Sequence, residues 1–156
     1  MAYMAKPTLI LKISIFVLLI TLFGSDLYAK EEKIRPKEFG VYIKTPQALI
    51  RIMPNIVFTG EGGVYYIESN NPKQYTLKDI EYFVIYGKYN LKVLTFNPLL
   101  FLQAPLGKPR FMFGQDIEIN VSDNGGNVYI VKPKALLWRG YFSIWIEETA
   151  WDFVIE

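Results

Sequence analysis

The alternation of hydrophobic and polar positions is clearest in residues 127–156. Three short runs there, over residues 128–131, 141–146 and 151–155, are rich in β-branched and aromatic side chains. Polar or turn-forming residues separate the runs, and this spacing predicts three consecutive β-strands. The last two runs are joined only by residues 147–150, a link short enough for an antiparallel hairpin.

The run over residues 141–146 divides its side chains between two faces. Successive side chains of a strand point to opposite sides, so Phe142, Ile144 and Ile146 are predicted to share one face. The opposite face would then carry Tyr141, Ser143, Trp145 and Glu147. Phe83, Phe142 and Phe153 are all predicted to point toward the core.

Similar short runs extend back toward the N-terminus. Strands are predicted over residues 40–44, 48–53, 56–58, 64–68, 80–86, 91–96, 99–102, 111–113 and 115–121. Residues 60–63 and 122–126 are rich in Gly, Asn, Asp and Glu, and the Gly and Asn positions accept the positive φ of tight turns. Residues 69–74 are predicted to form a loop, and Pro54 and Pro98 are predicted to stand at strand ends.

A helix is not favoured at any of these positions. Thr76 and Asp79 have the spacing of a helix capping box, but strand-forming residues follow them, and Gly87 interrupts any helix. About nine to eleven short strands with regularly spaced turns predict a single all-β domain. An antiparallel β-sandwich of the immunoglobulin-like type is the first choice, and a jelly roll or a partly closed barrel is the alternative.

The N-terminal segment predicts export. Lys6 and Lys12 precede the apolar run 13–23, and Ala29 offers a small residue for cleavage. This order is typical of a secretory signal peptide over residues 1–29, which leaves residues 30–156 as the folded domain. The alternative is an uncleaved helix that anchors the chain in a membrane, although the apolar run is shorter than the roughly 20 residues that a bilayer requires. We therefore expect an extracytoplasmic protein, periplasmic or secreted.

Composition narrows the possible chemistry. The chain has no cysteine and no histidine, which excludes disulfides, thiol catalysis and thiolate metal sites and removes the commonest general base. The lack of disulfides favours a bacterial cell envelope over an animal extracellular module. A formal net charge of +2 without a basic cluster argues against a nucleic-acid partner. No catalytic motif is present, so we predict a non-enzymatic protein without a cofactor.

Acidic residues leave two weaker hypotheses open. Oxygen ligands for Ca²⁺ are the only metal chemistry that this composition favours, and Asp116, Glu118, Asp123 and Asn124 would supply them. Alternating carboxylates are more typical of the solvated face of a strand. Glu147, Glu148 and Asp152 offer the paired carboxylates of a glycan-cleaving enzyme, although solvated loop charge is the simpler interpretation.

Exposed apolar and aromatic side chains are the remaining candidates for function. The segment 99–113 contains the predicted partner-binding residues Leu99, Leu100, Phe101, Leu106, Phe111 and Phe113. The predicted aromatic face contains Tyr65, Tyr66, Tyr141 and Trp145. Aromatic rows on a sheet bind sugars, peptides or partner domains, although a second core layer under a neighbouring loop is the simpler interpretation of these rings.

These residues predict a binding or accessory domain that contacts a protein partner, or a second copy of itself, through an edge strand or the segment 99–113. The alternatives are a carbohydrate-binding module or carboxylate-dependent glycan enzyme, and a membrane-anchored subunit.

Overall fold

The computed structural model describes residues 36–69, 71–102 and 107–156. The predicted signal peptide, residues 1–29, lies outside this range, as does Leu106. The described residues form strands and three short 3-10 turns, Glu61–Gly63, Leu77–Asp79 and Leu91–Val93, and contain no α-helix. In this part of the chain, no helix has the length and apolar character needed to cross a bilayer.

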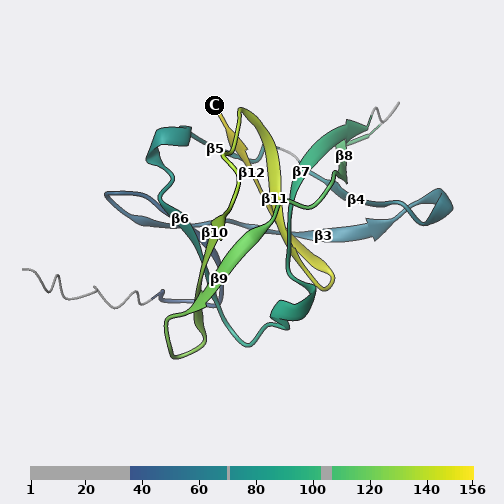
Figure 1. Cartoon of the computed structure of the whole chain (residues 1–156). Helices are drawn as coiled ribbons and strands as arrows, with labels where there is room; N and C mark the ends of the chain where they lie inside the picture. Colours follow the sequence, from purple (N-terminus) through teal and green to yellow (C-terminus); the bar gives the residue numbers. More distant parts are fainter. Residues whose placement is uncertain (1–35, 70, 103–106) are drawn as a thin grey trace, which may run out of the picture. The chain divides into compact units, whose positions relative to one another are not determined.

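Six strands close into an antiparallel barrel (Figure 1). In ring order they are β3 (Pro54–Thr59), β4 (Tyr65–Glu68), β8 (Arg110–Phe113), β7 (Thr95–Leu102), β11 (Gly140–Ile146) and β12 (Thr149–Ile155). The ring closes because β12 pairs with β11 on one side and with β3 on the other. A short strand, β5 (Lys73–Tyr75), runs parallel to β12 and pairs with its last residues.

A second, five-stranded antiparallel sheet packs beside the barrel. Its strands, in spatial order, are β2 (Leu49–Arg51), β1 (Gly40–Lys44), β6 (Tyr82–Tyr86), β10 (Val128–Pro133) and β9 (Ile119–Asp123). The turn between β9 and β10 has positive φ at Gly125, Gly126 and Asn127, as the sequence predicts for a tight hairpin. Strands β2 and β9 are the two edges of this sheet.

The main hydrophobic core lies between the sheet and the barrel. Phe83 of β6 meets Phe96 of β7 with ring centroids 5.1 Å apart and Phe153 of β12 at 5.2 Å. Phe142 of β11 stacks on Phe153 at 5.9 Å. All four rings are fully buried, so the inward orientation predicted for Phe83, Phe142 and Phe153 is confirmed. Phe142, Ile144 and Ile146 belong to this one cluster, which confirms the predicted division of β11 into two faces.

The all-β architecture is confirmed, but the immunoglobulin-like sandwich is not. A sandwich has two open sheets, whereas here one sheet curls until its first and last strands pair. The long strand β7 makes this possible. Its first residues pair with β11 and its last residues pair with β8, so it joins two walls of the barrel.

The strand predicted over residues 91–96 begins only at Thr95, because Leu91–Val93 form a 3-10 turn. Three further local predictions are wrong, and each of these errors involves tertiary pairing. Pro98 does not end a strand: β7 continues through it, and its carbonyl accepts a hydrogen bond from the Gly114 backbone N–H at 2.8 Å. Pro54 opens β3 instead of ending the preceding strand. Residues 73–75, predicted to lie in a loop, form β5 because the exposed edge of β12 is available to them. Propensity alone contains no signal for these pairings.

Candidate binding surfaces

A row of polar side chains crosses the interior of the barrel. Asn97 of β7, Ser143 of β11 and Asp152 of β12 are direct neighbours in the strand register, and all three are buried. Their strands alternate between the apolar core outside the barrel and this interior row. The predicted face of Tyr141, Ser143 and Trp145 is therefore the interior face of the barrel.

Each carboxylate oxygen of Asp152 has a hydrogen-bonding partner. The Ser69 hydroxyl donates to one oxygen, and the Asn55 side-chain N–H donates to the other at 3.3 Å. The same Asn55 amide nitrogen also donates to the Glu68 carbonyl at 2.9 Å. At the other end of the row, the Asn97 amide donates to Asp116 at 2.5 Å and to the Gly114 carbonyl at 3.1 Å. A buried polar group is tolerated when it is paired in this way.

Aromatic rings line one mouth of the barrel. Trp145 stacks on Phe113 with centroids 4.4 Å apart and an interplanar angle of 24°. Tyr65 tilts against Trp145 at 5.3 Å. The indole N–H donates to the Glu147 carbonyl at 2.6 Å, which holds the ring in place. The structure therefore brings together Tyr65 and Trp145, two of the four residues of the predicted aromatic face.

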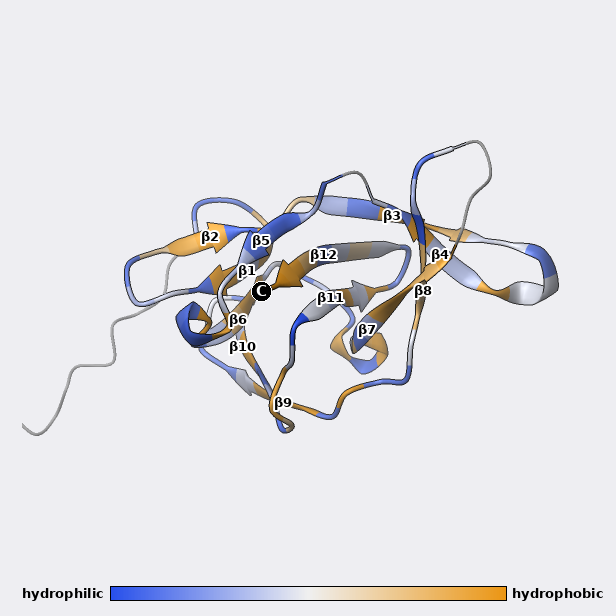
Figure 2. Cartoon of the chain, turned by 90° about the horizontal axis from the view of Figure 1, so that it is seen from above, coloured by the Kyte–Doolittle hydropathy of each residue, from blue (hydrophilic) through white to orange (hydrophobic). Residues whose placement is uncertain are grey.

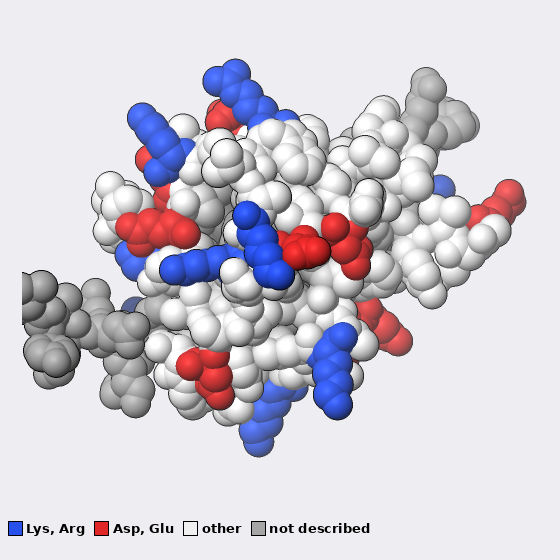
Figure 3. Space-filling view, viewed as in Figure 1, with Lys and Arg blue, Asp and Glu red and all other residues white. Residues whose placement is uncertain are grey.

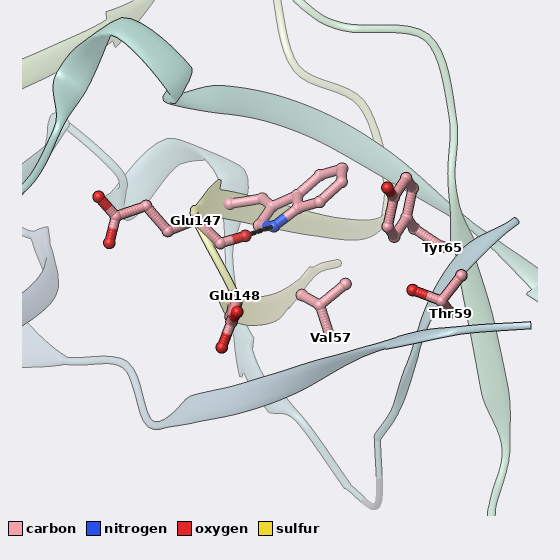
Figure 4. Close-up of a pocket in the computed structure, with 6 residues that line it drawn as sticks. Val57, Thr59, Tyr65, Glu147 and Glu148 are labelled. Atoms are coloured by element: carbon pink, nitrogen blue, oxygen red, sulfur yellow. Dashed lines mark hydrogen bonds between the residues drawn. The ribbon is translucent and has the colours of Figure 1, made fainter. Parts of the chain in front are cut away.

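A pocket of about 400 Å³ opens beside these rings. It is lined by Val57, Thr59, Tyr65, Trp145, Glu147 and Glu148. Figure 4 shows that the Glu147 carboxylate points away from Val57 and Tyr65, and that the Glu148 carboxylate points in a different direction. Both residues are exposed in the hairpin turn, whereas Asp152 is buried inside the barrel. The three carboxylates of the glycan-enzyme hypothesis therefore do not share this pocket.

The opposite mouth holds a second aromatic group. Tyr141 stacks on Phe111 with centroids 4.8 Å apart, and Phe101 meets Phe111 edge-on at 5.6 Å. These rings border a pocket of about 320 Å³ together with Ser69, Asn71, Pro72 and Gln74. Tyr141 thus lies at a different mouth from Tyr65 and Trp145, and the predicted aromatic face is not one continuous surface.

The outer surface of the barrel carries a row of apolar side chains, which we call the outer wall. Phe58 of β3 is the cross-strand partner of Tyr66 of β4, Tyr66 is the partner of Met112 of β8, and Met112 is the partner of Leu100 of β7. The Phe58 and Tyr66 rings stack at 5.5 Å. Leu100 is 51% exposed and Phe58 38%. The row therefore faces away from the barrel interior on four adjacent strands.

A second outward row lies two residues farther along each strand and contains both charged and apolar side chains. Glu68 of β4 pairs in register with Arg110 of β8, which pairs in turn with Leu102 of β7. The Arg110 guanidinium lies 3.1 Å from the Glu68 carboxylate and covers the Tyr66 ring at 4.9 Å. On β3, Ile56 points outward with 65% of its surface exposed. In Figure 2, β8 is hydrophobic over nearly its whole length.

The predicted partner-binding residues are divided among these surfaces. Leu100 lies on the outer wall, and Phe101 stands at a barrel mouth. Leu99 and Phe111 are buried inside the barrel, so these two side chains are not available to a partner. Phe113 is half-buried under Trp145, and Tyr66 of the predicted aromatic face lies on the outer wall.

The sequence interpretation missed Phe58 and Met112 as members of a surface. Alternation along β8 places Met112 opposite Phe111 and Phe113, but which side faces solvent depends on closure of the barrel. The candidate calcium ligands are also dispersed: Asp116 accepts from Asn97, and Asp123 accepts from the Gly125 backbone N–H at 2.7 Å. Among the described residues, no three His, Cys, Asp or Glu side chains are grouped as a metal site would require.

Comparison of the chain with protein-family models, with curated proteins and with solved structures finds no match. The fold and the surfaces described above are therefore the basis for any functional conclusion.

Proposed function

We propose that this chain is a non-enzymatic binding domain of the bacterial cell envelope, exported by residues 1–29, and that it binds a protein partner through the outer wall. The observation that carries this proposal is the apolar row of Phe58, Tyr66, Met112 and Leu100 on four paired strands. In monomeric proteins an extended apolar patch rimmed by polar residues marks an interaction site.

The wall has the properties of a preformed interface. Its side chains stand on paired strands, so little conformational entropy is lost when a partner covers them. The Tyr66 ring contacts both the Phe58 ring and the Arg110 guanidinium, and aromatic residues and Arg are the residue types that contribute most to binding at interfaces. Figure 3 shows that, on the face turned to the viewer, charged side chains are few over the region of β3, β4, β7 and β8.

The composition of the buried polar row also supports binding in preference to catalysis. Asp152 is hydrogen-bonded on both oxygens to Ser69 and Asn55, and its strand neighbours are Ser143 and, across β11, Asn97. Both carboxylate oxygens are thus occupied by donors of the protein itself inside the barrel, and the chain has no histidine to activate a hydroxyl. The row is best understood as a structural network.

Site-specific photo-crosslinking in the native envelope tests the proposal. A photo-reactive residue at Leu100 is expected to capture a defined protein, because this side chain would be covered by the partner. The matched control is Val121 on the edge strand β9, which is 41% exposed. Capture from Val121 but not from Leu100 would overturn the outer wall as the interface and favour pairing at the sheet edge. Capture from neither position would overturn the binding function.

Export is tested separately by the mass of the protein recovered from the envelope. Loss of residues 1–29 is expected if these residues are a cleaved signal peptide. Recovery of the intact mass would favour the anchored subunit.

A carbohydrate ligand at the first barrel mouth is a second candidate, favoured by the approach of Tyr65 to Trp145 beside the hydroxyl of Thr59. Aromatic faces bind sugar rings, and hydroxyl or carboxylate groups orient them. If this is correct, glycan-array binding should be lost in Trp145→Ala and kept in Tyr141→Ala, which removes a ring from the opposite mouth. A wild-type protein that binds no glycan would exclude this candidate.

A further inference from the structure

We infer that the partner of the outer wall is a second copy of this chain, an inference that rests on the proposed function. Homodimers with two-fold symmetry use one self-complementary patch, in which a residue of one copy meets a different residue of the other and the reverse contact also forms. The outer wall has this arrangement about a line between β4 and β8.

The apolar row is self-complementary about this line. A two-fold axis parallel to the strands, between β4 and β8, places β4 of one copy over β8 of the other. Tyr66 then faces Met112 of the second copy, and this contact occurs twice. Phe58 and Leu100 border the contact, because the outer surface of a closed barrel curves away from the axis on either side. Sheets packed face to face hold their strands nearly aligned, as this axis requires.

The charged row is self-complementary about the same line. Under the same axis, Glu68 of one copy faces Arg110 of the other, and Arg110 faces Glu68. Because the two residues are already 3.1 Å apart within one chain, dimerisation would create four charges of alternating sign. A wall with like charges on both central strands would repel its own copy. The alternating charges of Glu68 and Arg110 instead favour association with a second copy.

Complementary charge reversal tests the inference with the protein expressed from the full-length gene. Wild-type protein is expected to show a monomer–dimer equilibrium in sedimentation velocity over a wide concentration series. Glu68→Arg places two cations on the wall, and Arg110→Glu places two anions, so each variant alone should dimerise at least about tenfold more weakly. An equimolar mixture of the two variants is expected to recover the dimer, because each 68–110 contact between unlike copies is again of opposite sign.

Mixing does not change either chain, and the 68–110 ion pair within each chain stays broken. Recovery of the dimer in the mixture therefore cannot arise from an effect on folding. Thermal unfolding of each variant at low concentration provides the folding control. Met112→Asp should also dissociate the dimer, because Met112 faces Tyr66 of the second copy across the axis. A mixture that stays monomeric, beside a wild type that dimerises, would overturn this axis.

The outcomes separate this inference from the proposed function. A wild-type protein that stays monomeric at every concentration, while Leu100 captures a different protein in the envelope, overturns self-association and leaves the outer wall as a binding surface. A monomer with no capture from Leu100 overturns both.

Discussion

The two faces of the β11–β12 hairpin meet opposite environments. One face contributes Phe142 and Phe153 to an apolar core shared with the five-stranded sheet. The other face contributes Ser143 and Asp152 to the polar row inside the barrel, beside an apolar cluster that includes Ala150. The same fourteen-residue stretch of strand, residues 140–146 and 149–155, therefore takes part in two cores with different chemistry.

The difference shows how each core is stabilised. The apolar core gains free energy in proportion to the surface removed from water. The polar row inside the barrel gains less from buried area and requires a partner for every buried polar atom, because an unpaired one costs about 1–3 kcal/mol. Small barrels fill their interiors with side chains, and here Asp152, Asn97 and their partners supply part of that filling.

The largest effect is expected from the apolar side of the hairpin. Phe153→Ala removes a ring that contacts Phe83, Phe96 and Phe142 and should lower the free energy of unfolding by about 3–5 kcal/mol. Urea denaturation followed by tryptophan fluorescence measures this loss. Phe153→Leu, the control, keeps most of the buried area and should lose clearly less. Equal losses in the two variants would contradict the close packing of these rings.

A smaller loss is expected from the polar side. Asp152→Ala leaves the Ser69 hydroxyl and the Asn55 amide without their acceptor and should cost about 1–3 kcal/mol in the same measurement. Asp152→Asn keeps one acceptor oxygen and nearly the same volume, so it should cost less than the alanine. If Asp152→Ala proved as stable as the wild type, the barrel interior would not depend on its hydrogen bonds.

The smallest effect is expected where a polar atom stands in the apolar core. The Tyr75 hydroxyl is buried against Phe153 and has no hydrogen-bond partner among the described residues. Tyr75→Phe removes this unpaired group and should therefore raise the free energy of unfolding at neutral pH by about 1 kcal/mol, the lower end of the cost of an unpaired buried polar atom. This would contrast with Asp152→Ala, since only the latter breaks hydrogen bonds that the folded protein makes.

The same residue predicts a dependence on alkaline pH. Burial raises the pKa of Tyr75 to about 12 from its ordinary value of 10.0. The folded state then keeps the proton where the unfolded state has lost it, so this contribution to stability is complete below pH 10 and decreases as the pH rises toward about 12. Denaturation across this range should show a decline in the wild type that is smaller in Tyr75→Phe. Identical declines would contradict the burial of the hydroxyl.

Much of the strand pattern could be predicted from local sequence. Residues 40–44 and 141–146 are strands in the structure with the bounds shifted by at most one residue, because β-branched and aromatic runs bordered by turns have few other stable conformations. Strand β5 could not be predicted in this way. It has three residues and depends on the free edge of β12, which lies far away in the sequence.

The candidate surfaces were only partly predictable for the same reason. Residues 99–113 were expected to form an interface, yet Leu99 and Phe111 are inside the barrel while Leu100 and Met112 are outside. Side-chain alternation correctly places Leu99 and Phe111 on one face and Leu100 and Met112 on the other. It does not say which of the two faces is exposed to solvent. Both faces of the hairpin β7–β8 are apolar, so hydropathy does not distinguish them.

The sequence by itself determined the all-β character, the two faces of β11, the buried phenylalanines and, through the lack of cysteine and histidine, the narrow range of possible chemistry. These follow from side-chain alternation and composition, which are local properties of the chain. Only the tertiary structure decided that six strands close into a barrel, which face becomes its interior, and which apolar residues form the outer wall. Strand pairing between distant segments decides these features, and the energy of such pairing belongs to the assembled sheet instead of to any single segment.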